Sequence, residues 1–247
     1  MAYNLNNKLV IAISSRALFD LEEENQIFKK DGLDAYYKYQ LENEDKSLKK
    51  GTGYRLVENI LKINSFFSSD ERQVEVIILS KNNAATSLRI TNAINDLKLD
   101  IIRSAWTSGT NISNYLKAFK VDLFLSADDN DVLNAIENGV AAAKILHSNE
   151  NIHNISNEQV RIAFDGDAVL FSEESELVYK NHGLEAFIEH EKENRNNPLE
   201  MGPFAKLLLT IAKIQAKFPT DKSPIRTALI TARSAPTHER VIKTFNV

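Results

Sequence analysis

The sequence repeats itself at a fixed offset of 151 residues, and this repeat constrains the fold more than any other feature of the chain. The offset holds without a gap and pairs, among others, Gly32 with Gly183, Ala35 with Ala186, Gly51 with Gly202 and Arg89 with Arg240. Because solenoid units are only about 20 to 50 residues long, a period of this length indicates two domain-sized copies of one fold.

The two copies are expected to differ in length. The first is assigned to residues 1–150 and the second to residues 151–247, with the polar segment 149–158 as the linker. Val247 aligns with Asp96, so residues 97–150 have no counterpart in the second copy. The second copy is therefore predicted to be incomplete.

Short apolar runs rich in β-branched residues alternate with segments of helical periodicity. Strands are predicted at residues 8–13, 74–79, 99–102, 121–125 and 140–146, and helices at 33–41, 54–67, 85–97 and 132–138. The second copy repeats the beginning of this order, with strands at 160–164 and 225–230 and helices near 175–194 and 203–218. This alternation predicts an α/β protein with a mostly parallel sheet, which binds ligands beyond the carboxyl ends of its strands.

Charge and composition exclude several classes of function. The net charge is -4 at pH 7 and the pI is about 5.8, so no binding of nucleic acid polymers or of anionic membranes is expected. The chain has no Cys, which excludes disulfides, thiolate metal sites and cysteine nucleophiles. No signal peptide and no apolar run of membrane-spanning length is found, so a cytoplasmic location is expected. The composition leaves the oligomeric state open, including a homo-oligomer.

The strongest candidate site follows the first strand of the second copy, where Asp165, Gly166 and Asp167 replace Ser14, Ser15 and Arg16 of the first copy. Gly166 allows the backbone to turn, so that both carboxylates can face one pocket. One carboxylate can then attack as a nucleophile with Mg²⁺ alongside, while its neighbour acts as general acid and base. The alternative is a solvated acidic loop or a helix cap.

A second group of polar residues follows the next strand of the second copy. Thr231 ends that strand, and Arg233 and Ser234 follow in the turn, where they are candidates for binding a phosphate. The alternative for Thr231 and Ser234 is that either one caps the following helix. Because the two groups follow neighbouring strands, a binding site is favoured.

The first copy lacks the same chemistry, since Ser14 is a poor phosphoryl acceptor without a base and Arg16 does not donate a proton at neutral pH. Arg16, Ser80 and the turn 107–109 are candidates for holding an anion, but a structural role is favoured. The pair Asp128 and Asp129 follows another strand and is expected either to cap a helix or to lend carboxylates to the second copy.

Longer stretches around these motifs resemble the type I cytosolic 5'-nucleotidase family of the haloacid dehalogenase-like phosphohydrolases. In the second copy these stretches read AFDGDAVLFSEESE, GLEAFIEHEKEN and LITARSAPTHERVIKT, and in the first copy ISSRALFDLEEENQIF, YLKAF and LFLSADDNDV. The resemblance implies two tandem haloacid dehalogenase-like, Rossmannoid copies. It also implies Mg²⁺-dependent hydrolysis of nucleoside 5'-monophosphates, with Asp165 as phosphoryl acceptor, Asp167 as general acid and base, and Thr231 on the phosphate.

Members of the family continue beyond the helix that matches residues 238–245, with a Lys that neutralises the phosphate and an Asp-Asp pair that binds Mg²⁺. In this chain Asp165 and Asp167 are the expected metal ligands. Two functions therefore stay open. One is an active phosphoric monoester hydrolase, and the other is a catalytically impaired relative that acts as a nucleotide-binding or interaction module.

Overall fold

The structure is a computed structural model that describes residues 4–147 and 159–245. It divides into two compact units, Met1–Val160 (unit 1) and Arg161–Val247 (unit 2). The expected linker at 149–158 lies outside the described residues. Each unit is described by itself.

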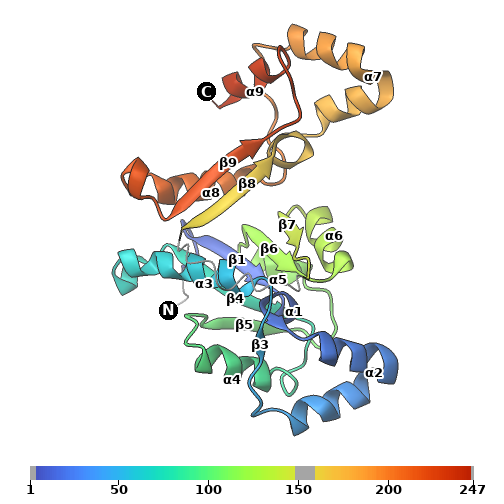
Figure 1. The fold of residues 1–247 in the computed structure, drawn as a ribbon, viewed down its shortest axis with the longest axis vertical. Helices are drawn as coiled ribbons and strands as arrows, with labels where there is room; N and C mark the ends of the chain where they lie inside the picture. The colour runs from blue at the N-terminus through green and yellow to red at the C-terminus, as the bar shows by residue number, and fades with distance from the viewer. Residues whose placement is uncertain (1–3, 148–158, 246–247) are drawn as a thin grey trace. The chain divides into compact units, whose positions relative to one another are not determined.

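Unit 1 is built on a five-stranded parallel sheet (Figure 1). In chain order its strands are β1 (Leu9–Ile13), β4 (Val74–Ser80), β5 (Arg103–Trp106), β6 (Leu123–Ser126) and β7 (Ala142–Lys144). The spatial order is β5-β4-β1-β6-β7, so the first strand lies at the centre. Every residue of β1 is buried, as an uninterrupted apolar run requires in a sheet covered on both faces. The predicted α/β class with a mostly parallel sheet is confirmed.

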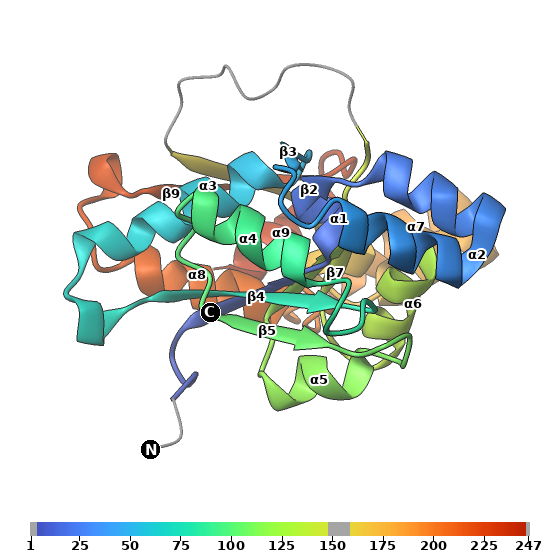
Figure 2. The same ribbon diagram turned by 90° about the horizontal axis from the view of Figure 1, so that it is seen from below.

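Helices cover both faces of this sheet (Figure 2). On one side lie α3 (Tyr54–Lys62) and α4 (Leu88–Asp96), and on the other lie α5 (Ser113–Ala118) and α6 (Asp129–Glu137). Side chains of the strands pack with those of the helices into one core that includes Val10, Ala12, Ile77, Leu79, Leu116, Phe124 and Ala135. The 3₁₀ turns η1 (Ile63–Phe66) and η2 (Ser69–Glu71) lead from α3 into β4.

The segment between β1 and α3 forms a small accessory region. It consists of α1 (Ser15–Leu18), the antiparallel pair β2 (Phe19–Asp20) and β3 (Lys49–Lys50), and the long helix α2 (Glu22–Glu42). Within α2, Gly32 has φ 84° and ψ -174°, a conformation that is essentially confined to glycine, so the helix is kinked there. The helix predicted at 33–41 is thus the second half of a longer kinked one.

One strand prediction was wrong, and the short helices α1 and α5 were missed. Residues 99–102 do not form a strand, because the N–H groups of Leu99 and Ile101 are bonded to the carbonyls of Ile94 and Leu99 in the turn that ends α4. The chain extends only from Arg103, where β5 can pair with β4. The sequence did not predict α5, which has only six residues and no side-chain cap.

Unit 2 contains a two-stranded sheet of β8 (Val160–Asp165) and β9 (Ile225–Ile230) (Figure 1). Its helices are the kinked α7 (Glu174–Glu193), α8 (Ala205–Gln215) and α9 (His238–Thr244). The turn η4 (Gly166–Leu170) follows β8, and the 3₁₀ turn η5 (Thr220–Lys222) precedes β9. Phe171, Leu199 and Val241 form a buried cluster against which Leu229 of β9 packs.

Elements recur in unit 2 at the offset of the sequence repeat. Helices α3 and α8 begin at Tyr54 and Ala205, and strands β4 and β9 begin at Val74 and Ile225. Gly183 kinks α7 with φ 83° and ψ -176°, nearly the values of Gly32. These recurrences support the tandem-copy interpretation, which stays a prediction.

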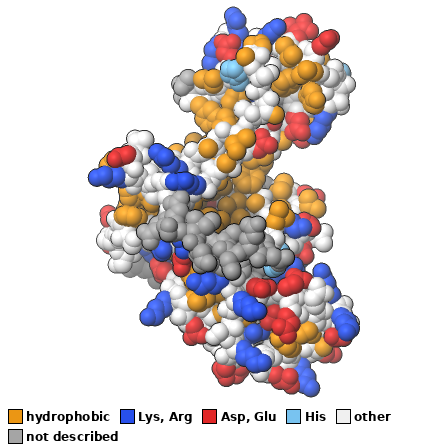
Figure 3. Space-filling model, in the orientation of Figure 1, with side chains coloured by type: hydrophobic (Ala, Val, Ile, Leu, Met, Phe, Trp, Pro, Cys, Tyr) orange, Lys and Arg blue, Asp and Glu red, His pale blue; other side chains and the backbone are white. Residues whose placement is uncertain are grey.

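The surface matches the charge pattern of the sequence. On the face drawn in Figure 3, acidic and basic side chains are interspersed over unit 1 and do not gather into one basic surface. Among the residues that the structure describes, no helix combines the length and the apolar character needed to cross a membrane.

Candidate functional site

The Asp-Gly-Asp segment forms the turn at the end of β8. Strand β8 ends with Asp165, whose side chain is exposed, and the chain then folds back so that the N–H of Phe171 donates to the carbonyl of Gly166 at 3.0 Å. Gly166 is buried, whereas Asp167 is partly exposed. In the described part of the chain, no hydrogen bond or ion pair engages the Asp165 carboxylate. It is therefore available to a ligand at the strand end.

Thr231 lies against this turn. A Cβ atom added to Gly166 would be 3.7 Å from the Cβ of Thr231, so the ends of β8 and β9 are adjacent as the sequence predicts. The Thr231 hydroxyl accepts a hydrogen bond from the N–H of Arg233 at 3.2 Å and keeps its own proton to donate. Ser234 is exposed in the same loop.

The helix-cap interpretation of Thr231 and Ser234 is wrong. Helix α9 begins at His238, and its N-cap residue is Thr237. The hydroxyl of Thr237 donates to the carbonyl of Ser234 at 2.7 Å, so Ser234 contributes its backbone to the turn before the helix. The side chains of Thr231 and Ser234 are not needed as caps.

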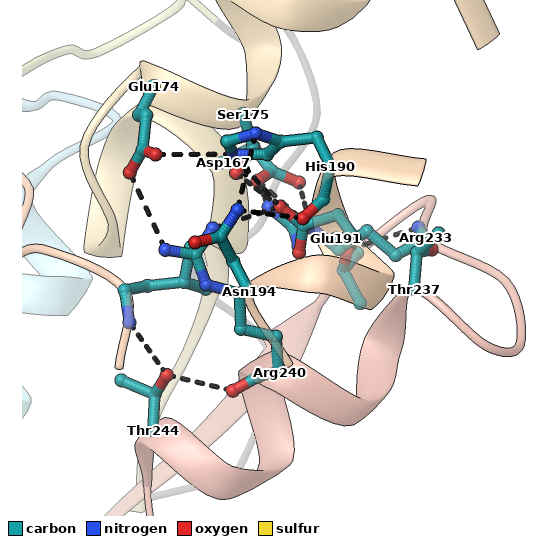
Figure 4. Close-up of polar contacts among 12 residues, drawn as sticks. Asp167, Glu174, Ser175, His190, Glu191, Asn194, Arg233, Thr237, Arg240 and Thr244 are labelled. Atoms are coloured by element: carbon teal, nitrogen blue, oxygen red, sulfur yellow. Dashed lines mark hydrogen bonds and ion pairs between the residues drawn. The ribbon is translucent and has the colours of Figure 1, made fainter. Parts of the chain in front are cut away.

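Asp167 is held by Arg233 (Figure 4). The Nε atom of Arg233 lies 3.1 Å from Oδ1 and 3.0 Å from Oδ2 of Asp167, and Nη2 also donates to Oδ1. Such a fork fixes the plane of a carboxylate as well as its distance. The solvated-loop alternative is therefore wrong for Asp167, and Arg233 is directed at a carboxylate of the site.

Around Arg233 lies a group of charges, which we call the arginine–carboxylate cluster: Asp167, Arg233, Glu191, Arg240 and Glu174 (Figure 4). The side chains of Arg233, Glu191 and Arg240 are buried, whereas those of Asp167 and Glu174 are partly exposed. Glu191 contacts Arg233 through Oε2 and Arg240 through Oε1, the latter at 3.1 Å. Burial lowers the pKa of Arg233, but hydrogen bonds and charge from Asp167 and Glu191 raise it, so the pKa lies above its ordinary value. Arg233 thus keeps its charge.

Sequence reasoning missed Glu191 and Arg240. Arg240 did carry a signal, because it matches Arg89 in the repeat, but its contact with Glu191 spans 49 residues and has no local motif. His190 adjoins the cluster, with Nε2 3.2 Å from Oε1 of Glu174. The chemistry of this region therefore extends from the strand ends into α7 and α9.

The residues fit a metal site only in part. Asp165 offers a hard oxygen ligand of the kind that Mg²⁺ prefers. Both oxygens of Asp167 are engaged by Arg233, and within residues 4–147 and 159–245 no group of three or more His, Cys, Asp or Glu side chains is arranged to hold a metal ion.

The equivalent strand ends in unit 1 carry hydroxyls. Ser14 and Ser126 are linked at 3.3 Å, and Ser15 and Ser80 at 3.0 Å, all of them buried. Arg16 lines a neighbouring cavity of about 360 Å³, whose walls also include Asp20, Glu22, Lys144 and His147. Acidic and basic groups balance there, so the lining favours no particular charge of ligand.

Two other candidates of unit 1 have structural roles. Asp128 caps α6, since its side chain accepts from the N–H of Asp131 at 3.1 Å, and Asp129 pairs with Lys144 at 2.7 Å. In the turn 107–109, all three N–H groups donate to carbonyls of Ser80, Asn82 and Lys81. The prediction that one of the pair Asp128 and Asp129 caps the helix is confirmed, and the N–H groups of the turn 107–109 are already used within unit 1.

The parallel sheet of unit 1 makes this an α/β protein, and the Asp-x-Asp turn beside the strand-end Thr of unit 2 is its candidate small-molecule site. The sequence model of the 5'-nucleotidase family matches residues 1–247, and the chain belongs to this family. Human cytosolic 5'-nucleotidase 1B is 35% identical to it over an alignment of 247 residues that covers 96% of this chain and 40% of that protein. The chain thus spans about two fifths of the length of this curated relative.

Proposed function

We propose that the protein is a phosphoric monoester hydrolase that converts nucleoside 5'-monophosphates into nucleoside and phosphate. The carrying observation is the Asp-x-Asp turn lying against Thr231 in a chain of the 5'-nucleotidase family. The relative's name supports this substrate class and supports a cytosolic location, which stays a prediction.

In the proposed reaction Asp165 is the nucleophile and Asp167 the general acid and base. A carboxylate oxygen of Asp165 forms a bond to phosphorus while the bond from phosphorus to the 5' oxygen breaks, and the departing oxygen takes a proton from Asp167. Asp167 then removes a proton from water, which attacks phosphorus and breaks the aspartyl-phosphate bond. Phosphate leaves, and Asp165 is regenerated.

Thr231 and Ser234 would donate hydroxyl hydrogen bonds to the phosphate oxygens, and Arg233 supplies positive charge beside them. Family membership supports a metal-dependent reaction, and we propose Mg²⁺ as the ion. When bound, it would neutralise charge on the phosphate. Asp165 would hold it through its exposed carboxylate, whereas Asp167 is engaged by Arg233 and serves proton transfer.

A catalytically impaired, nucleotide-binding or interaction module is the second candidate. It is favoured by the partial metal-ligand set of the described residues. An active hydrolase and a nucleotide-binding module would both bind a nucleoside monophosphate, so turnover distinguishes these two. Assembly into a homo-oligomer is compatible with either.

The test uses two substitutions at positions matched by the repeat. Asp165→Asn removes the nucleophile and should reduce phosphate release from AMP and IMP by about 10³-fold or more. Ser14→Ala, at the equivalent strand end of unit 1, should leave turnover within about twofold of the wild type. Chelation by EDTA should abolish release, and added Mg²⁺ should restore it.

Activity that survives Asp165→Asn would contradict the assigned nucleophile. A wild-type chain that binds AMP in calorimetry but releases no phosphate would favour the impaired module.

A further inference from the structure

Both units bury an arginine at the same place in the repeat. The Nε atom of Arg89 donates to the carbonyl of Lys46 at 3.0 Å, and that of Arg240 donates to the carbonyl of Asn197 at 2.8 Å. The acceptors are themselves matched by the offset of 151 residues. Both side chains are at least 90% buried. The two arginines therefore hold equivalent backbone segments and serve the fold in the same way.

The carboxylate that neutralises this arginine differs between the units. In unit 1 it is Glu24, in the first half of α2, and the neutral Gln40 lies at 3.4 Å in the second half. In unit 2 the position of Glu24 is occupied by Ser175, and that of Gln40 by Glu191. The buried negative charge has thus moved from the first half of the kinked helix to the second, while the partly exposed Glu174 in the first half lies 3.6 Å from Arg240.

This exchange gives the carboxylate a second partner. Ser175 donates to Oε1 of Glu191 at 2.7 Å, and the same oxygen accepts from Arg240, which leaves Oε2 directed at Arg233. The side chain of Glu191 is fully buried and that of Arg233 is 2% exposed. A buried guanidinium needs a charged partner. For Arg233 that partner is Glu191, in the second half of α7.

Unit 1 shows the same location without the pair formed by Arg233 and Asp167. Asn82 stands where unit 2 has Arg233, Tyr36 where it has Phe187, and Arg16 where it has Asp167. The amide of Asn82 donates to the hydroxyl of Tyr36 at 3.0 Å, whereas in unit 2 the guanidinium of Arg233 lies over the Phe187 ring at 5.3 Å. The extra charges therefore accompany the Asp-x-Asp turn and are not demanded by the fold.

We propose that Glu191 is a positioning residue for the candidate active site, a role that rests on the proposed function. It orients the guanidinium of Arg233, which in turn fixes the carboxylate of Asp167 for proton transfer. Arg240, Glu191, Arg233 and Asp167 form a row of alternating charges, from the structural arginine to the acid and base. Glu191 thereby connects the packing of α7 and α9 to the turn after β8.

The test separates this role from a purely structural one by giving unit 2 the residues of unit 1 at positions 175 and 191. Glu191→Gln removes the buried carboxylate that Arg233 and Arg240 share and leaves them only Asp167 and Glu174. We therefore expect a lower Tm and a kcat reduced by about 10- to 100-fold, with the KM for AMP changed less than about threefold. The double substitution Ser175→Glu with Glu191→Gln returns a carboxylate to Arg240 alone. It should recover Tm without recovering kcat, and Glu191→Asp should recover part of kcat.

A second measurement does not depend on turnover. In ¹H–¹⁵N spectra the Nε–H of Arg233 should give a signal protected from exchange in the wild type, and it should be lost in Glu191→Gln and in the double variant. If the double variant does not fold, a second one replaces Arg233 and Phe187 by their unit 1 counterparts, as Arg233→Asn with Phe187→Tyr. It should fold and lose as much kcat as Glu191→Gln does.

Recovery of both Tm and kcat in the double variant would overturn the proposal, as would an unchanged kcat in Glu191→Gln. A wild type without turnover would defeat the proposed function, whereas an Arg233 signal that persists without Glu191 would defeat the positioning role.

Discussion

At the scale of single residues, two glycines lie where one turn crosses directly over another. A Cβ atom at Gly51 would be 2.7 Å from the carbonyl carbon of Phe19, and one at Gly202 would be 2.5 Å from the carbonyl oxygen of Val169. Their N–H groups donate to Leu18 and Leu170 at 2.9 and 2.8 Å. These contacts involve backbone atoms, which cannot rotate away as a side chain can.

We therefore expect Gly51→Ala and Gly202→Ala each to lower the free energy of unfolding by about 1 to 3 kcal/mol. Urea unfolding followed by circular dichroism measures this. Gly166→Ala is the control, because its Cβ would meet Leu229 and Phe171 at 3.6 Å, an ordinary contact. Equal losses in all three variants would show that the close backbone approach is not the cause.

The same scale shows how far a sequence can define the candidate site. Asp165, Asp167 and Thr231 could be predicted because each lies at or just after an apolar strand, and adjacent parallel strands bring such residues together. The partner of Arg233 could not be predicted. Its contact with Glu191 spans 42 residues, and which buried charges meet depends on how the kinked α7 packs.

At the scale of elements, Arg89 joins α2 to α4 in unit 1. It pairs with Glu24, and both side chains are more than 90% buried. By contrast, the pair Lys38 and Glu42 is 3.8 Å apart on the exposed surface of α2. A buried ion left without its partner is strongly destabilising, whereas exposed pairs contribute little because water screens them.

Glu24→Gln is accordingly expected to lower the free energy of unfolding by about 3 kcal/mol. Glu42→Gln, in the same helix, should change it by less than about 0.5 kcal/mol. Denaturant titration of both variants gives the comparison. If Glu24→Gln lowers the free energy of unfolding no more than Glu42→Gln does, Gln40 suffices to compensate the charge of Arg89.

Elements were predictable to different degrees for a physical reason. The strands at 8–13 and 74–79 were recognised because strands buried on both faces of a sheet are mostly apolar. Strand β1 is apolar throughout, and β4 is apolar except for Glu75 and Ser80. The edge strand β5 is only partly buried, so its sequence carries no such run. Its start is set by pairing with Ile77 of β4, a contact between distant residues.

At the scale of the whole molecule, the two units treat the same strand end in opposite ways. Ser14 is buried in unit 1 among Ser126 and Asp131, whereas Asp165 is exposed at the equivalent point of unit 2. The hydroxyl of Ser80, which corresponds to Thr231, is engaged with Ser15 and Asn82. We infer that only unit 2 performs the proposed chemistry.

Restoring a carboxylate to unit 1 should therefore cost stability and give no activity. Ser14→Asp introduces a buried charge close to Asp131, and we expect the free energy of unfolding to fall by about 3 kcal/mol. In the background of Asp165→Asn it should not restore phosphate release from AMP, because Arg16 cannot deliver a proton to the departing oxygen. Unfolding in urea and a phosphate assay on the single and double variants give both results. Turnover by the double variant would instead mean that unit 1 retains a working strand-end site and that its serine alone keeps it silent.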